Sequence, residues 1–359
     1  MQEKELPEDD QETSEEDLWF LPGPPEETNP EDPPWPMAAR EGSLEPAVWR
    51  GAEAAQFRAL LNAGQAAARF AERLRQFPDG VAERMALSTV SAILQEEGIW
   101  LGEDRIALYR VLRIGVSDQA RDLSRADWAI RRLLAAAGSE SPVADLAVFL
   151  GRSAVSEPQK IRGEDRPSGI ELDGLSDQMH HTLSGTKNCH AFLRATYAFS
   201  MWRAEGITPW DELLEPTVAA LRIAASDTGF PAGLQFLPLI AGYRLDRHTL
   251  EDARGSAEAR LTTFCTAVEA GALSGLMALD QLAAWETRAK EATVDLSGRT
   301  PPLLIEALMR YPMVSAELVS EVVGNSKAAA RRNLNLFLER GLIREVTGQD
   351  RYRFWTVTG

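Results

Sequence analysis

The chain has 359 residues, 44% hydrophobic and 26% charged, which is enough for two or three domains with a sizeable core. Its two cysteines exclude a disulfide framework, and its acidic start lacks the regions of a secretory signal, so we expect a cytoplasmic protein. The net charge of -16 does not exclude a polyanion partner, because thirteen acidic residues and one lysine lie between Met1 and Pro34, whereas residues 300–359 carry eight basic and six acidic residues.

Residues 1–44 form an acidic, proline-rich tail that buries too little apolar surface to offset the entropy of ordering, so we expect it to be disordered. The apolar run Leu18–Leu21 stands among the acids of this tail. The run is either a docking motif for a protein partner or a segment that folds back on the protein's own body.

The body is predicted to be all helical, because apolar residues recur at three- and four-residue steps and no stretch before residue 340 alternates as a strand does. The first helix, Ala52–Phe77, has one apolar stripe that serves either as core packing or as a dimer seam. The last, Ser256–Trp285, is long enough to break near Gly271 or Gly275. The helices between them are predicted at Gly80–Gln95, Arg105–Leu112, Ser124–Ala137, Asn188–Ala204 and Pro209–Ala225.

These patterns predict two helical regions, 45–155 and 171–299, joined by a linker at 156–170 that is rich in proline, glycine and charge. A C-terminal domain follows at 300–359. The most apolar run, Phe230–Tyr243, is too short to span a bilayer, so we expect no membrane partner.

The C-terminal domain begins with three predicted helices. Thr300, with Pro301 and Pro302 after it, is a helix start, and this helix should run to about Arg310. The second helix is capped by Ser315 and ended by Gly324, and the third runs from its cap, Ser326, to about Arg340. Two short helices joined by a tight turn that contains glycine predict a helix-turn-helix, whose second helix enters the DNA major groove.

The third helix has one apolar face and one polar face. Ala330, Leu334, Phe337 and Leu338 share the first, and Ala328, Arg331, Arg332 and Asn335 share the second. Small, cationic and amide side chains suit a groove, because arginine bonds guanine or phosphate and asparagine bonds adenine. Ser326 and Lys327 lie at the helix N-terminus, where free N–H groups favour a phosphate.

Beyond Gly341, Leu342–Val346 and Arg351–Val357 alternate as two strands of a β-hairpin. Arg344, Arg351 and Arg353 should lie on its solvent side, where the wing of a DNA-binding domain meets phosphates or the minor groove. The predicted fold class is therefore mainly α, a multi-helical body with a C-terminal winged helix-turn-helix of three helices and a β-hairpin.

The stretch Pro312–Trp355, above all IREVTGQDRYRFW, resembles a largely uncharacterised family of alphaproteobacterial proteins, many of them plasmid-borne. They pair a helical N-terminal region with a C-terminal helix-turn-helix DNA-binding domain. Weaker likeness extends through Phe57–Phe77 and through EEGIWLGED at residues 96–104. The resemblance implies DNA binding and regulation, and it supplies no ligand or catalytic residue.

The C-terminal domain also resembles the winged helix that follows the catalytic domain of many AMP-transferring Fic proteins. Their motif, His-Pro-Phe followed by Gly-Asn-Gly-Arg, is absent from this sequence, which argues against that activity.

Other chemistry has little support in the sequence. His180, His181, Cys189 and His190 lie close together but match no zinc spacing, and Ser184 with Lys187 fits Ser-x-x-Lys without its companion motif. No phosphate loop or dinucleotide fingerprint occurs. We therefore predict no catalytic residue, no metal site and no cofactor, so that the protein is not an enzyme.

The sequence predicts a bacterial DNA-binding protein that acts as a transcriptional regulator on duplex DNA. One small module seldom binds tightly by itself, so we expect a homodimer assembled through the helical body. The alternative is a helical adaptor that uses the winged module and the acidic tail for protein contacts.

Overall fold

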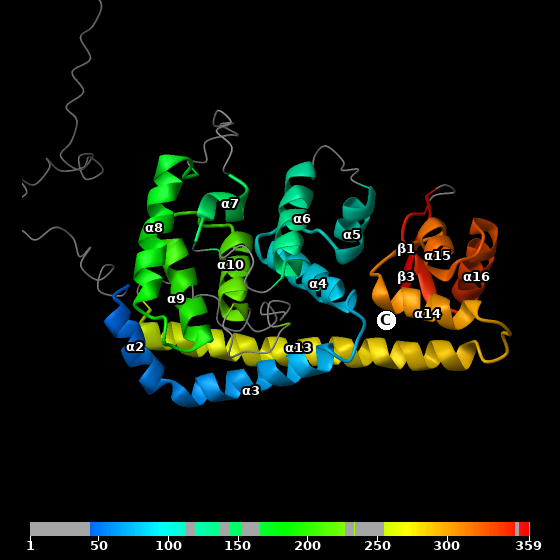
Figure 1. Ribbon diagram of the computed structural model, residues 1–359, viewed down its shortest axis with the longest axis horizontal. Helices are drawn as coiled ribbons and strands as arrows, with labels where there is room; N and C mark the ends of the chain where they lie inside the picture. Colours follow the sequence, from blue (N-terminus) through cyan, green and yellow to red (C-terminus); the bar gives the residue numbers. More distant parts are fainter. Residues whose placement is uncertain are drawn as a thin grey trace, which may run out of the picture.

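The computed structural model describes residues 44–112, 119–136, 142, 144–152, 166–226, 233, 255–348 and 352–358. These residues are mainly α-helical, with one three-stranded sheet near the C-terminus, so the predicted fold class is confirmed. Two long helices, α3 (Phe57–Leu74) and α13 (Ala257–Ala292), pack along each other and form a base on which the shorter helices stand (Figure 1).

The body contains eight further helices among the described residues: α2 (Pro46–Ala55), α4 (Val81–Glu96), α5 (Glu103–Leu112), α6 (Ala120–Leu134), α7 (Leu146–Leu150), α8 (Ile170–Ser184), α9 (Ala191–Ala204) and α10 (Leu214–Ala225). The predicted helices are present with shifted ends. Where one helix was expected from Ala52, the backbone leaves the helical region at Gln56 and separates α2 from α3. Helix α8 was not predicted.

Helix α9 is the centre of the body, because nearly all of its residues are buried. Helices α2, α8, α10 and α13 pack around it. On the α2 side, the Trp49 and Tyr197 rings lie 4.9 Å apart, and the Tyr197 hydroxyl donates to the Leu44 carbonyl at 2.5 Å. Trp202 Nε1 donates to Thr208 Oγ1 at 2.8 Å, so its polar atom is satisfied in the core.

Helix α13 runs unbroken through Gly271 and Gly275, so the expected break there is wrong. Each glycine costs about 1 kcal/mol in a helix relative to alanine, and both are buried within α13. At the N-terminus, Ser256 Oγ accepts the Ala259 N–H at 3.2 Å and caps the helix.

By length and composition, α13 also meets the criteria for a membrane-spanning helix. Its most apolar 18-residue window has a mean hydropathy of 1.3, and 50% of that window is buried inside the protein. A core helix meets the same criteria, so this is weak evidence for a membrane.

A buried network of ion pairs connects the middle of the body. Glu97, at the end of α4, accepts the backbone N–H groups of Leu213 and Leu214 at 2.7 and 2.8 Å, at the start of α10. The same carboxylate pairs with Arg125 of α6 at 2.7 Å, and Arg125 reaches Glu212 at 3.0 Å. The network therefore fixes α4, α6 and α10 to one another.

Replacing Glu97 by alanine should lower the free energy of unfolding by about 3–5 kcal/mol, because it leaves a buried arginine and two backbone N–H groups short of acceptors. Urea unfolding followed by circular dichroism measures this loss. The control is Glu72→Ala, which removes an exposed carboxylate paired with Arg75 at 3.3 Å and should cost at most about 1 kcal/mol. Equal losses in the two variants would contradict the structural role of Glu97.

Candidate nucleic-acid interface

The C-terminal domain contains a helix-turn-helix with the caps that the sequence predicts. Helices α15 (Ala316–Val323) and α16 (Lys327–Glu339) are joined by Gly324, Asn325 and Ser326. Ser315 Oγ accepts the Leu318 N–H at 3.2 Å, and Ser326 Oγ accepts the Ala329 N–H at 3.2 Å. Gly324 ends α15 in the left-handed region at φ 71°, which glycine adopts without steric cost. These local signals predict the motif correctly.

The first helix of the domain, α14 (Thr300–Arg310), has the predicted ends but not the predicted cap. Thr300 lies inside the helix, and the residue before it, Arg299, makes no capping hydrogen bond through its side chain. Pro301 and Pro302 occupy the first turn, where a missing N–H has no helical partner to lose.

Helix α16 presents the predicted polar face to solvent. Ala330, Leu334 and Phe337 are buried against the domain core, and Leu338 is half-buried. On the opposite side, Ser326, Lys327, Ala328, Arg331 and Arg332 are exposed, and Asn335 is half-buried. Arg331 and Arg332 form no ion pair with any of the described residues. Helix α16 packs on α15 and on the sheet, at the end of the molecule far from α8 (Figure 1).

The wing is a three-stranded antiparallel sheet in the order β1 (Val314–Ser315), β3 (Phe354–Val357) and β2 (Ile343–Glu345). The hairpin of β2 and β3 was predicted, with longer strands than the structure has. Strand β1 was not predicted, because two residues show no alternation. It pairs Val314 with Trp355 and Ser315 with Phe354, so the start of α15 is fixed to the wing.

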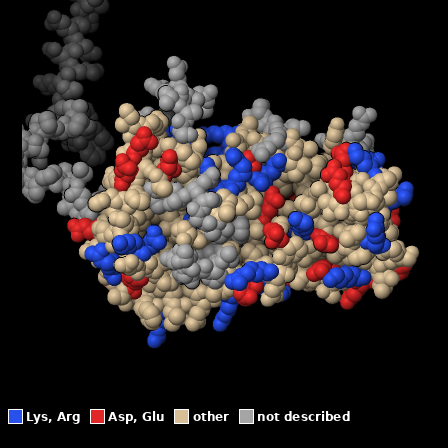
Figure 2. All heavy atoms as spheres, in the orientation of Figure 1, with Lys and Arg blue, Asp and Glu red and all other residues tan. Residues whose placement is uncertain are grey.

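Three of the candidate DNA-binding cations have carboxylate partners. Lys327 pairs with Glu317 of α15, and Arg344 Nη1 lies 2.7 Å from Asp104 Oδ2 of α5 in the body. Arg353 is half-buried, pairs with Glu345 and lies over the Trp355 ring at 5.2 Å, so it is less exposed than the alternating pattern predicts. Arg351 lies outside the described residues. Figure 2 shows cationic and acidic side chains interspersed over this domain.

The domain is docked on the body through contacts that the sequence does not reveal. Arg84 of α4 donates to the carbonyls of Leu308 and Tyr311, each at 2.5 Å, at the end of α14. Burial lowers the pKa of Arg84 to about 10, which leaves the guanidinium charged at neutral pH. Gly80 approaches α14 so closely that a Cβ there would lie 1.7 Å from the Arg310 carbonyl oxygen. From α13, Trp285 Nε1 donates to the Leu342 carbonyl at 2.7 Å.

The histidines and cysteines considered as a metal cluster do not assemble into a site. His190 caps α9 by accepting the Phe192 N–H on Nδ1 at 3.2 Å, and burial raises the pKa of the Cys189 thiol to about 11. His180 and His181 lie on α8, and the Ser184 hydroxyl donates to the His181 carbonyl at 2.5 Å. Among the described residues, no group of three or more metal-ligating side chains is found.

Three helices and a wing, with a cationic face on the third helix, define the class of winged helix-turn-helix domains. Residues 301–358 match the family model described as an HTH DNA binding domain. This part of the chain is therefore a helix-turn-helix DNA-binding domain.

Comparison of the whole chain adds little to this assignment. No curated protein sequence matches it. A solved structure of a Fic family protein from Desulfovibrio desulfuricans G20 aligns over 84% of this chain and 96% of its own, with 16% identity and a TM-score of 0.45. That TM-score is too low for the likeness to carry an argument about fold or activity.

Replacing Asp104 by asparagine should strengthen DNA binding up to about fivefold, because it frees Arg344 from an exposed pair worth at most about 1 kcal/mol. Fluorescence anisotropy with a labelled duplex measures the change. The control is Asp280→Asn, which removes the same charge from a pair with Arg73 at 2.8 Å on α13. An equal gain in both variants would show that net charge alone is responsible, and no gain would show that Arg344 does not meet DNA.

Proposed function

We propose that this protein is a transcriptional regulator that binds duplex DNA with α16 in the major groove and its wing beside the backbone. The observation that carries the proposal is the exposed pair Arg331 and Arg332, on the outer face of the second helix of a helix-turn-helix. Two arginines without carboxylate partners among the described residues are available to guanine edges and phosphates.

The surrounding residues support the same placement. Ala328, one turn before Arg331 and Arg332, is small enough to let the helix approach base edges closely. Asn335 follows Arg331 by four residues, so both side chains lie on one face, where an amide can pair with adenine. The free N–H groups at Ser326 and Lys327 favour a backbone phosphate. Lys327 and Arg344 would exchange their exposed carboxylate partners for phosphates.

Replacing both Arg331 and Arg332 by alanine should weaken binding to a duplex by about tenfold or more without changing the melting temperature, because both side chains are exposed. Anisotropy at two salt concentrations should also show a smaller dependence on salt, since fewer counterions are displaced.

The matched control replaces Arg58 and Arg69 by alanine, two exposed arginines on α3. This control should leave the affinity nearly unchanged. Equal losses in the two double variants would place DNA elsewhere on the surface. Absence of binding by the unaltered protein at low salt would favour the adaptor function, in which the winged module contacts proteins.

The proposal includes a homodimer in the cytoplasm, formed through the helical body. Leu273 and Met277, four residues apart on one face of α13, are 62% and 55% exposed. A second copy of the chain would cover these apolar side chains. We expect Leu273→Glu to give a monomer and Thr287→Glu, an exposed position farther along α13, to keep the dimer. Sedimentation equilibrium distinguishes them, and a monomeric unaltered chain would contradict the dimer.

The absence of enzymatic activity and the wider family likeness over the body remain predictions from the sequence. The body contributes to the proposed function by holding the DNA-binding domain in a fixed orientation.

A further inference from the structure

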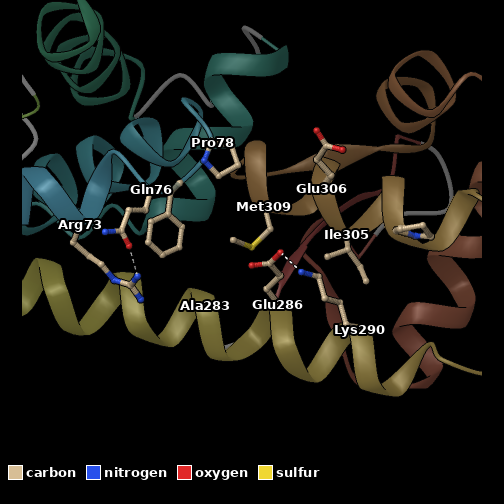
Figure 3. Close-up of a pocket in the computed structure, with 11 residues that line it drawn as sticks. Arg73, Gln76, Pro78, Ala283, Glu286, Lys290, Ile305, Glu306 and Met309 are labelled. Atoms are coloured by element: carbon tan, nitrogen blue, oxygen red, sulfur yellow. Dashed lines mark hydrogen bonds and ion pairs between the residues drawn. The ribbon is translucent and has the colours of Figure 1, made fainter.

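A pocket of about 510 Å³ lies where the body meets the DNA-binding domain (Figure 3). One wall comes from the end of α3 and the loop after it, the second from α13, and the third from α14. Its volume is within the range of small-molecule sites, which often lie between domains. The proposed function makes no use of this pocket.

The pocket combines apolar surface with charges of both signs. The half-buried Phe77 gives it apolar surface, and Ile305 and Met309, which are almost fully buried, add a little more. In Figure 3 the Met309 side chain and the Glu286 carboxylate reach toward the middle, with Arg73 and Gln76 on one side and Glu306 on the other. The pocket is therefore suited to a ligand with an apolar body and polar ends.

The charged groups of the lining form partly exposed ion pairs, and Arg73 also donates to Gln76 at 2.8 Å and lies over the Phe77 ring at 5.1 Å. Lys290 pairs with Glu286 at 2.7 Å within α13, and Arg73 with Asp280 at 2.8 Å, in both cases with at least one side chain mostly exposed. Such pairs contribute about 0–1 kcal/mol, so a ligand can take the place of either partner at little cost. Glu306 of α14 is exposed and has no ion-pair partner in the described part of the chain.

The balance of these charges indicates the class of ligand. A ligand with only an amine would be attracted by Glu286 and Glu306 but repelled by Lys290 and Arg73. A ligand with only a carboxylate would be attracted by the two cations and repelled by the two carboxylates. A ligand that carries both charges satisfies both sets of groups. We propose that the pocket binds a small zwitterion with a large apolar body, of the class of α-amino acids with an aromatic or bulky aliphatic side chain.

A ligand in this pocket would act directly on the DNA-binding domain. Its ammonium group would meet Glu286 of α13, while the ligand would also contact α14, which lines the pocket with Ile305, Glu306 and Met309, so it would touch both the body and the first helix of the domain. Arg84 holds the end of α14 on the body. A ligand at the side of α14 would therefore change the orientation of this helix without detaching it. This coupling rests on the proposed function, whereas binding to the pocket does not.

Saturation-transfer NMR on the full chain tests the site with three probes that share one ring: L-phenylalanine, phenethylamine and 3-phenylpropionate. We expect L-phenylalanine to bind at least tenfold more tightly than the two probes with a single charge. Equal binding of the three would overturn the zwitterion class, and binding of none would overturn the site.

Two pocket variants and one control show where the probe binds. Ala283→Leu should abolish binding by filling the pocket, and Glu306→Gln should weaken it at least fivefold without changing its shape. Ala284→Leu adds the same bulk at an exposed position beside Ala283 and should have no effect. Melting curves show whether each variant is folded. Retained binding by both pocket variants would move the ligand elsewhere.

Anisotropy of a labelled duplex with and without L-phenylalanine then measures the coupling. We expect at least a threefold change in the DNA dissociation constant, lost in Ala283→Leu and kept in Ala284→Leu. If the DNA dissociation constant does not change while L-phenylalanine is bound, the coupling is contradicted but the binding site is not. No DNA binding in any condition would overturn the proposed function, while the NMR result still decides the pocket.

Discussion

One buried guanidinium fixes the position of the DNA-binding domain. The last carbonyls of a helix have no partner within it, and Arg84 supplies donors to those of Leu308 and Tyr311 at the end of α14. Arg84 belongs to α4, which packs on α6 and α10 and shares in the ion network around Glu97. The orientation of α16 is therefore set by the core of the body, not by a flexible linker. In a dimer formed through that body, the spacing between two recognition helices would be fixed as well.

Most of the described cations of the candidate interface already have carboxylate partners. Glu317, Asp104 and Glu345 each hold a cation of the candidate interface, so phosphates would compete with carboxylates already in place. Among the candidate DNA-binding cations that the structure describes, Arg331 and Arg332 on the outer face of α16 are the two without carboxylate partners. Binding is therefore expected to depend mainly on a short helical surface, and its dependence on salt should be modest because few counterions are displaced.

The sequence predicts what local chemistry decides. The caps Ser315 and Ser326 and the left-handed Gly324 are set by a few neighbouring residues, so the helix-turn-helix and its exposed face could be placed before the structure was known. Contacts between residues far apart in the chain could not be predicted from the sequence. Asp104 and Arg344 lie 240 positions apart, and nothing local in either segment shows that they meet. The continuity of α13 was also missed, because the burial of Gly271 and Gly275 inside the folded protein is not visible in the local sequence.

Helix α8 and strand β1 show two further limits. The buried residues of α8, which include Leu172, Met179 and Leu183, are separated by Gly174 and polar residues, so its apolar stripe is faint in the sequence. Strand β1 exists only because β3 lies beside it. Both elements depend on tertiary partners more than on their own propensity.

The contact between the body and the DNA-binding domain depends on the absence of a side chain at Gly80. Even the smallest added side chain would put a carbon 1.7 Å from the Arg310 carbonyl oxygen, a separation that a packed interface cannot hold. Helix α14 would have to move away from Gly80, and Arg84 would then lose its hydrogen bonds to the Leu308 and Tyr311 carbonyls. Gly80 directly precedes α4, so the clash would act on the contact between α4 and α14. One methyl group at this position would thus loosen the contact between α4 and α14, while the contacts of α13 with the domain, such as Trp285 with Leu342, would remain.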